Sequence, residues 1–329
     1  MMLDTIQILT LLSTPGIGRV TIQQVISTLK SNVLDSRDLY DVLVEAKAQS
    51  ARIKKVPSQD ELKRAFLKAQ AILEDAHKSE TRVISFYDKD FPKQLRLIPD
   101  HPVLLYVKGD ERALTRDPSI AIIGTREPTD YGSTMARRCG QLFSEEGFVV
   151  VSGLALGCDT AAHEGALAVH GRAVAVLAHG LNMIYPSKNK QLAQEILSKG
   201  GCLVSEYAPQ EKPRKSYFVE RDRIQSGLSK AVVVIETDIS GGTMHTVRSC
   251  IEQKKPVGCL VHPEKYATHP KSNGNRYLLR EKGAIGLFSS GDVDAFIATI
   301  APSLHIPSSF DQESGNTIKQ LSFTDWVGV

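Results

Sequence analysis

Residues 119–126, Ser-Ile-Ala-Ile-Ile-Gly-Thr-Arg, decide the fold, because a short and continuous apolar run ends there in a glycine and an arginine. Further apolar runs follow along the chain, at 148–151, 173–177, 202–204, 231–235 and 257–261. Continuous runs are typical of parallel strands that are buried on both faces. The intervening segments are long enough for crossover helices. The pattern predicts an α/β fold with a doubly wound, mostly parallel sheet, in which ligands bind beyond the carboxyl ends of the strands.

The sequence before the predicted sheet has a helical pattern. Apolar residues recur at helical spacing up to about residue 80, and Ser58 with Glu61 forms a capping pattern for a helix over 58–77. The cluster 14–18, Thr-Pro-Gly-Ile-Gly, predicts a tight turn between two helices. We therefore expect a helical N-terminal domain over 1–80, an α/β domain over 81–300 and a flexible C-terminal tail over 301–329. Two strands, at 81–87 and 103–107, are expected to begin the α/β domain.

The composition excludes several classes of protein. With 42% hydrophobic and 23% charged residues, the chain is neither disordered nor fibrous. No apolar run is long enough to span a membrane, and the start does not resemble a signal peptide. Five cysteines without a CxxC pair argue against disulfides or a zinc site and favour the cytoplasm. A net charge of +3 does not by itself indicate a polyanion partner.

Small and charged residues follow the first parallel strand. Gly124 lets the backbone approach a ligand, Arg126 offers a guanidinium fork, and a helix begins shortly afterwards. Together with Thr125 they form a candidate phosphate site, although an ordinary turn with an exposed arginine explains them equally well. Neither a GxGxxG nor a GxxxxGK[ST] motif is present, so no nicotinamide or P-loop cofactor site is indicated.

The loop after the next strand contains Ser152 and Gly153, and then Asp159 and His163 one helical turn apart. Such a pair could hold a metal or act as an acid and a base, but a third ligand is missing from the local sequence. An Asp159 helix cap with a buried histidine is the favoured interpretation, and no metal is expected.

Three later segments also fit anion binding. Lys188 and Lys190 lie at a helix start. The basic stretch 209–230 places Tyr217 and Phe218 among lysines and arginines, which suits a groove for single strands, although a solvated loop with packed aromatics is about as plausible. The segment 239–246, Ile-Ser-Gly-Gly-Thr-Met-His-Thr, is a loop of small residues at a helix start and forms a further anion cradle.

From about residue 87 to residue 293 the chain resembles the DprA/Smf family of bacterial DNA-processing proteins. The resemblance rests on an ordered series of short motifs, at 91–95, 106–109, 122–126, 151–155, 159–163, 185–186, 205–206, 218–229, 240–241 and 283–284. The turn at 14–18 is similar to a helix-hairpin-helix turn, as in the family's SAM-like helical domain. A Rossmann-like α/β domain is implied.

The resemblance implies a non-enzymatic protein that binds and protects single-stranded DNA. It further implies a homodimer in the cytoplasm that helps to load the RecA recombinase during natural transformation or recombination, with no cofactor. The residues implied to meet DNA are the cations Arg126, Lys188, Lys190, Arg221 and Arg223, the stacking residue Phe218, and the small residues Gly124, Thr125, Ser152, Gly153, Ser240, Gly241, Gly242 and Thr243.

Some positions depart from the family pattern. Arg-Asp-Arg stands at 221–223 where Arg-Asn-Arg is usual, and His262-Pro263 replaces a usual Pro-Gly. The loop 240–246 is one residue longer than usual and resembles the phosphate loop of LOG-type phosphoribohydrolases. The alternative is therefore a nucleotide-binding sensor or LOG-type hydrolase, with phage defence as one setting and Glu206 or Glu236 as an acid/base. DNA binding chiefly by the helical domain is a third and weaker alternative.

Overall fold

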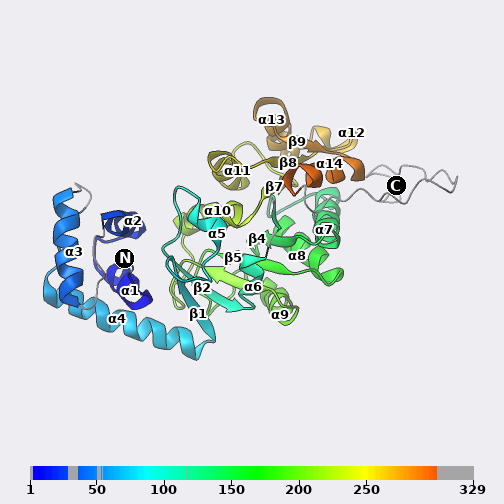
Figure 1. Ribbon diagram of the computed structural model, residues 1–329. Helices are drawn as coiled ribbons and strands as arrows, with labels where there is room; N and C mark the ends of the chain where they lie inside the picture. The colour runs from blue at the N-terminus through cyan, green and yellow to red at the C-terminus, as the bar shows by residue number, and fades with distance from the viewer. Residues whose placement is uncertain (1–2, 29–35, 50–52, 54, 117, 302–329) are drawn as a thin grey trace.

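The structure is a computed structural model, and it describes residues 3–28, 36–49, 53, 55–116 and 118–301. The expected tail at 301–329 lies outside the described residues from residue 302 onward. Figure 1 shows the N-terminal helices gathered at one end of the molecule, beside β1 and β2, while β7, β8 and β9 lie toward the other end.

Four helices form the N-terminal part: α1 (Thr5–Ser13), α2 (Arg19–Thr28), α3 (Ser36–Gln49) and α4 (Gln59–Lys78). The expected capping box begins α4, since the Glu61 amide donates to Ser58 Oγ and the Ser58 amide donates to Glu61 Oε2. The predicted turn joins α1 to α2, and Gly16 takes a φ of 81° there, a value that favours glycine.

Nine strands form one sheet in the order β1-β2-β6-β5-β4-β3-β7-β8-β9. Their bounds are β1 (Thr81–Ser85), β2 (Leu104–Gly109), β3 (Ser119–Ile123), β4 (Val149–Ser152), β5 (Ala173–Leu177), β6 (Cys202–Ser205), β7 (Ala231–Val234), β8 (Val257–Leu260) and β9 (Ile285–Leu287). In sheet order, the seven strands β6, β5, β4, β3, β7, β8 and β9 are parallel to their neighbours. At one end of the sheet β2 pairs antiparallel with β6, and β1 pairs antiparallel with β2. The predicted α/β fold with a mostly parallel sheet is confirmed.

The remaining helices connect the strands. They are α5 (Lys93–Arg96), α6 (Arg112–Thr115), α7 (Asp130–Glu145), α8 (Cys158–Ala168), η1 (Ser187–Asn189), α9 (Lys190–Ser198), α10 (Lys215–Leu228), α11 (Thr243–Glu252), α12 (Glu264–Ala267), η2 (Pro270–Ser272), α13 (Asn273–Glu281) and α14 (Ser290–Ile300). Helices cover both faces of the sheet, and alternate side chains of β3 point into the two cores that result. Ile120 and Ile122 pack in the core that contains α7, α8 and α14, while Ala121 and Ile123 pack in the core that contains α10, α11 and α13.

The direction of winding reverses beside β3. Strands β4, β5 and β6 extend the sheet to one side of it, and β7, β8 and β9 extend it to the other. A crevice at the carboxyl ends of the strands is expected at such a switch point. The edge strand β9 was not predicted, because only Leu287 of its three residues is buried.

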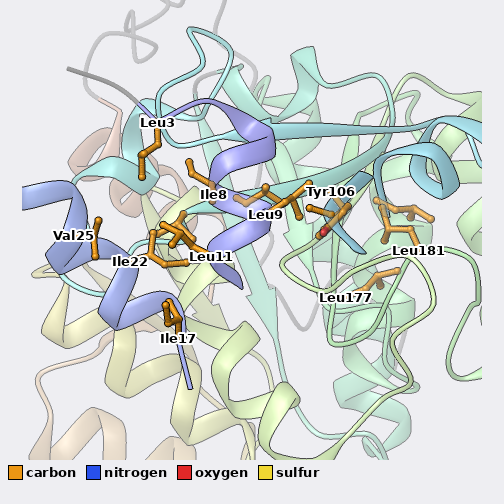
Figure 2. Packing of buried hydrophobic residues seen from close by; sticks show 14 of the residues in the cluster. Leu3, Ile8, Leu9, Leu11, Ile17, Ile22, Val25, Tyr106, Leu177 and Leu181 are labelled. Atoms are coloured by element: carbon orange, nitrogen blue, oxygen red, sulfur yellow. The ribbon is translucent and has the colours of Figure 1, made fainter. Parts of the chain in front are cut away.

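The helical part and the sheet share one apolar core. Figure 2 shows Leu9 of α1 beside Tyr106 of β2, with Leu177 and Leu181 beyond it. An ion pair strengthens the contact, since Arg19 at the start of α2 donates to both carboxylate oxygens of Asp100 at 2.9 and 2.7 Å. The division at residue 80 stays a prediction, although α4 ends at Lys78 and β1 begins at Thr81.

Among the described residues, no helix combines the length and apolar character that crossing a membrane requires. The same residues contain no cluster of three or more histidine, cysteine or acidic side chains that could hold a metal ion.

Candidate functional site

A cavity of about 530 Å³ opens at the carboxyl ends of β3, β4 and β7, which is the switch point of the sheet. Its lining comes from segments that are far apart in the chain. The expected site residues that line it are Gly124, Thr125, Arg126, Phe218, Arg221, Ser240, Gly241, Gly242 and Thr243. The sheet topology thus brings together three of the loops that the sequence singled out.

The loop after β3 presents Arg126 to the cavity. Gly124 is required for close packing, because a Cβ there would lie 2.4 Å from the sulfur of Cys158. The Thr125 amide donates to the Glu236 carbonyl at 2.7 Å, which fixes the loop against β7. Arg126 is exposed, and its guanidinium carbon lies 5.1 Å from the centre of the Phe218 ring. This cation–π pair forms a charged, flat surface at the mouth of the cavity.

The loop after β4 supports the cavity from behind. Ser152 Oγ donates to the Ile122 carbonyl, and the Gly153 amide donates to Asp159 Oδ2 at 3.1 Å. A Cβ at Gly153 would lie 1.8 Å from Nη1 of Arg221, so glycine is needed to admit that side chain. Ser152 and Gly153 therefore position other groups and do not themselves line the cavity.

Arg221 is almost completely buried, with 6% of its surface exposed. Its Nη1 donates to the Val176 carbonyl at 2.6 Å, and its Nε lies 3.2 Å from Oδ1 of Asp222. It therefore carries a fixed positive charge at the inner wall of the cavity. Burial in protein makes such a charge act more strongly on a bound anion than a charge in solvent would.

Asp222 also lines the cavity and is 8% exposed. Burial, together with the nearby charge of Asp159, raises the pKa of its carboxyl group to about 6, despite the opposing effect of Arg221. The cavity thus contains an acidic group that can change its charge close to neutral pH.

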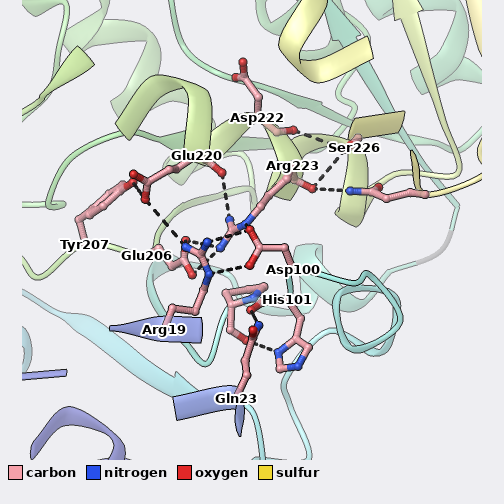
Figure 3. Close-up of polar contacts among 12 residues, drawn as sticks. Arg19, Gln23, Asp100, His101, Glu206, Tyr207, Glu220, Asp222, Arg223 and Ser226 are labelled. Carbon is pink, nitrogen blue, oxygen red and sulfur yellow. Dashed lines mark hydrogen bonds and ion pairs between the residues drawn. The ribbon is translucent and has the colours of Figure 1, made fainter. Parts of the chain in front are cut away.

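Arg223 points to the other side of α10. Its guanidinium donates to both oxygens of Glu206 at 2.7 Å and to Asp100 at 3.0 Å (Figure 3). Asp222 points away from this cluster in the same view. Arg221 and Arg223 therefore do not share a face, and Arg223 does not line the cavity.

The loop after β7 forms the opposite wall. A Cβ at Gly242 would meet no atom within 4 Å, so this part of the loop borders open space. The ten-residue helix α11 begins directly afterwards, with Gly242 as an N-cap that provides no side-chain hydrogen bond. The amides of Met244 and His245 already donate to the Gly241 and Gly242 carbonyls at 3.0 Å. Among the described residues the amides of Gly242 and Thr243 have no such acceptor, so these two can donate to an anion in the cavity.

Lys188 and Lys190 lie outside this lining, at the exposed start of α9. Tyr185, three residues before Lys188, is 47% exposed, and its ring centre lies 6.1 Å from that of Phe218. The expected contact of Lys188 and Lys190 with DNA stays a prediction.

His245, Thr246 and Lys271 also line the cavity, although they were not among the expected contact residues. Thr246 and His245 lie in the first turn of α11, so the helix spacing after 240–243 would have indicated them. Lys271 comes from η2 and pairs with Glu127 at 3.7 Å. No local motif marks it.

No hydrogen bond joins Asp159 to His163 among the described residues. Gly157, and not Asp159 as expected, is the N-cap of α8, and Asp159 accepts the amides of Gly153 and Ala155. His163 is fully buried, and neither ring nitrogen has a hydrogen-bond partner among the described residues. Burial lowers the pKa of His163 to about 3, so the ring stays neutral.

The two carboxylates considered as an acid/base lie outside this cavity. Glu206 is paired with Arg223, as described above. Glu236 is 1% exposed and accepts both the amide and the hydroxyl of Thr129, the N-cap of α7, at 2.8 and 2.6 Å. Burial acts to raise the pKa of Glu236, but His262, whose Nε2 lies 3.3 Å from Oε1, and the hydrogen bonds from Thr129 outweigh it and lower the pKa.

Comparison with known families gives a clear match. The family model described as DNA recombination-mediator protein A matches residues 82–297. Protein Smf of Synechocystis sp. is 36% identical over 233 residues, which are 67% of this chain and 58% of that protein. DNA processing protein DprA of Bacillus subtilis is 33% identical over 246 residues, which are 74% of this chain and 80% of that protein.

Solved structures agree with these matches. The X-ray structure of DNA processing protein A from Streptococcus pneumoniae superposes with a TM-score of 0.71 and 29% identity, and covers 90% of this chain and 98% of that one. A structure of DNA processing protein A from Helicobacter pylori, whose description concerns its single-stranded DNA binding mode, superposes with a TM-score of 0.60 and 30% identity. That match covers 69% of this chain and 98% of the other.

Proposed function

Because this chain belongs to the DNA recombination-mediator protein A family, we propose that it binds single-stranded DNA, without a chemical reaction of its own, in the cavity at the carboxyl edge of the sheet. By resemblance, we further propose that it protects the strand and helps to load the RecA recombinase in recombination or natural transformation. The described cysteines are all free and buried, which supports a reducing compartment such as the cytoplasm.

The observation that carries this proposal is the pairing of Arg126 with Phe218 at the mouth of the cavity. Proteins that bind single strands without sequence preference combine cations for the phosphates with aromatic faces for the bases. Here both groups lie 5.1 Å apart at one opening. Arg221 adds a positive charge inside the cavity, and the start of α11 adds backbone amides.

The expected site residues then divide into three groups. We propose that Gly124, Thr125, Arg126, Phe218, Arg221, Ser240, Gly241, Gly242 and Thr243 contact the strand. Lys188 and Lys190 attract its phosphates from the exposed start of α9. Ser152, Gly153 and Arg223 hold the surrounding backbone and helix α10 in place.

The nucleotide-binding alternative is not favoured. Its hydrolase form named Glu206 or Glu236 as an acid/base, and neither carboxylate lines the cavity. The relatives from Bacillus subtilis, Streptococcus pneumoniae and Helicobacter pylori are named as DNA processing proteins.

Replacing Arg126 tests the proposal. A charge-assisted contact to phosphate contributes roughly 1.5–3 kcal/mol, so Arg126→Ala should weaken binding of fluorescent oligo-dT by about ten- to a hundredfold. The melting temperature should not change, since Arg126 is exposed. Arg116→Ala is the matched control, because Arg116 is also exposed and lies just before β3, at the opposite edge of the sheet. If Arg126→Ala abolishes binding of a free nucleotide but keeps full DNA affinity, the nucleotide-binding alternative replaces the proposal.

A further inference from the structure

A second cavity, of about 660 Å³, lies between the helical part and the sheet. Its apolar wall includes Leu9 and Leu12 of α1, Ile72 of α4 and Leu104 of β2. Cavities of this size are typical of binding sites for small ligands or for one part of a larger ligand. The helices contribute residues that precede residue 82, where the family match begins.

Both cavities open at the same edge of the sheet. Tyr106 of β2 pairs with Ser205 of β6 in antiparallel register, so the start of β2 lies beside the carboxyl end of β6. The segment directly after β6, from Glu206 to Lys212, lines the second cavity, just as the segments after β3 and β7 line the first. Four strand spacings separate β3 from β2, which is roughly 20 Å along the edge.

The first turn of α10 stands between the two cavities. Phe218 lines the first cavity and its neighbour Tyr217 lines the second. The Tyr217 ring stacks on Tyr207 with centres 3.8 Å apart, and the guanidinium carbon of Arg214 lies 5.3 Å from the centre of the same ring. An aromatic and cationic surface therefore continues from one cavity to the other.

The charges of the second cavity favour an anion at its rim. Three carboxylates line the cavity, and each has a cation beside it. Glu206 is paired with Arg223 at 2.7 Å, Glu211 lies 3.4 Å from Arg214, and Glu220 lies 3.9 Å from Arg19. Lys68 of α4 and Lys212 are exposed lining residues without an ion pair among the described residues. Each can meet a phosphate without first breaking a contact within the protein.

We propose that a single DNA strand bound in the first cavity continues along the carboxyl edge into the second. A base stacks on the Tyr217 side of α10 and phosphates lie at Lys68 and Lys212. This inference rests on the proposed function and extends it, because it makes the helical part a portion of the DNA site. The ligand is single-stranded DNA of any sequence, since stacking and phosphate contacts do not read base edges.

The test compares oligo-dT of about 4 nucleotides with oligo-dT of about 20 nucleotides. The variant Lys68→Ala with Lys212→Ala should weaken binding of the long strand roughly tenfold and leave the short strand unchanged. Its log–log salt slope for the long strand should lose about 0.7 for each phosphate contact removed. Lys78→Ala is the matched control, because Lys78 is exposed on the same helix but lies near the start of β1.

A second readout reports proximity. All five cysteines are buried, so a fluorophore attached through Lys68→Cys labels one exposed position. Its emission should change with the long strand and not with the short one. Suppose that Arg126→Ala weakens binding of both strands, that the double lysine variant binds both strands as the unaltered protein does, and that the emission of the label changes with neither. This inference then fails and the proposed function stands. If the unaltered protein binds neither strand, both fail.

Discussion

The Asp222 carboxyl group shares a cavity with the groups that we propose to meet phosphate, and burial raises its pKa to about 6. A carboxylate repels phosphate, whereas the protonated acid does not. Binding of oligo-dT should therefore tighten as pH falls through about 6. Because the folded pKa is raised, the ionised form is disfavoured in the folded protein, and the associated stability is lost as pH rises through the same value.

Asp222→Asn should remove both effects. At pH 7.5 it should tighten oligo-dT binding by up to about tenfold, and its binding should depend less on pH than that of the unaltered protein. Fluorescence anisotropy at about pH 5 and pH 7.5 measures this, with Asp60→Asn at the exposed start of α4 as the control. Weaker binding by Asp222→Asn would mean that the ion pair with Arg221 outweighs the repulsion.

At the scale of elements, the strands and the edge of the sheet could be predicted from sequence because their signals are local. The apolar run before Gly124 indicates a buried strand, and the rule for carboxyl ends places Arg126 beside the cavity. The directions of Arg221 and Arg223 could not be predicted. They depend on helix α10, in which residues two apart point to nearly opposite sides. Lys271 could not be found either, since only the tertiary fold brings η2 to the cavity.

His163 in helix α8 makes the stability of the folded protein sensitive to acid. Burial lowers the pKa of His163 to about 3, whereas an unfolded histidine titrates near 6.5. The unfolded state therefore binds the proton first, and stability that is present above pH 6.5 is lost as pH falls toward 3. Between pH 8 and pH 5 the free energy of unfolding should fall by about 2 kcal/mol through this group.

Urea unfolding at those two pH values checks the prediction. His163→Gln cannot take up the proton, so its loss of stability between pH 8 and pH 5 should be smaller by that amount. His77→Gln, at an exposed position in the last turn of α4, should behave like the unaltered protein. Equal pH dependence in all three proteins would contradict the assignment.

At the scale of the whole molecule, β9 ends the sheet and leaves one strand edge without a partner strand among the described residues. Ile285 and Phe288 are 39% and 40% exposed beside it. An exposed strand edge with apolar side chains favours pairing with another chain. We therefore propose a homodimer whose contact includes residues 257–288.

Light scattering at micromolar concentration tests this assembly. The unaltered protein should be a dimer, and Ile285→Lys should shift it toward the monomer. Ile251→Lys is the matched control, because Ile251 is 44% exposed on α11 and lies outside the proposed contact. A monomer with and without DNA would contradict the proposal.

The central claim is that the edge of the sheet binds single strands through phosphate charge and stacking. Competition between oligo-dT and a duplex of equal length, followed by fluorescence anisotropy over a range of salt concentrations, tests it most directly. We expect a clear preference for the single strand, and a log–log salt slope of about −0.7 for each phosphate neutralised. Equal affinity for single strand and duplex, or an affinity that does not change with salt, would contradict the account.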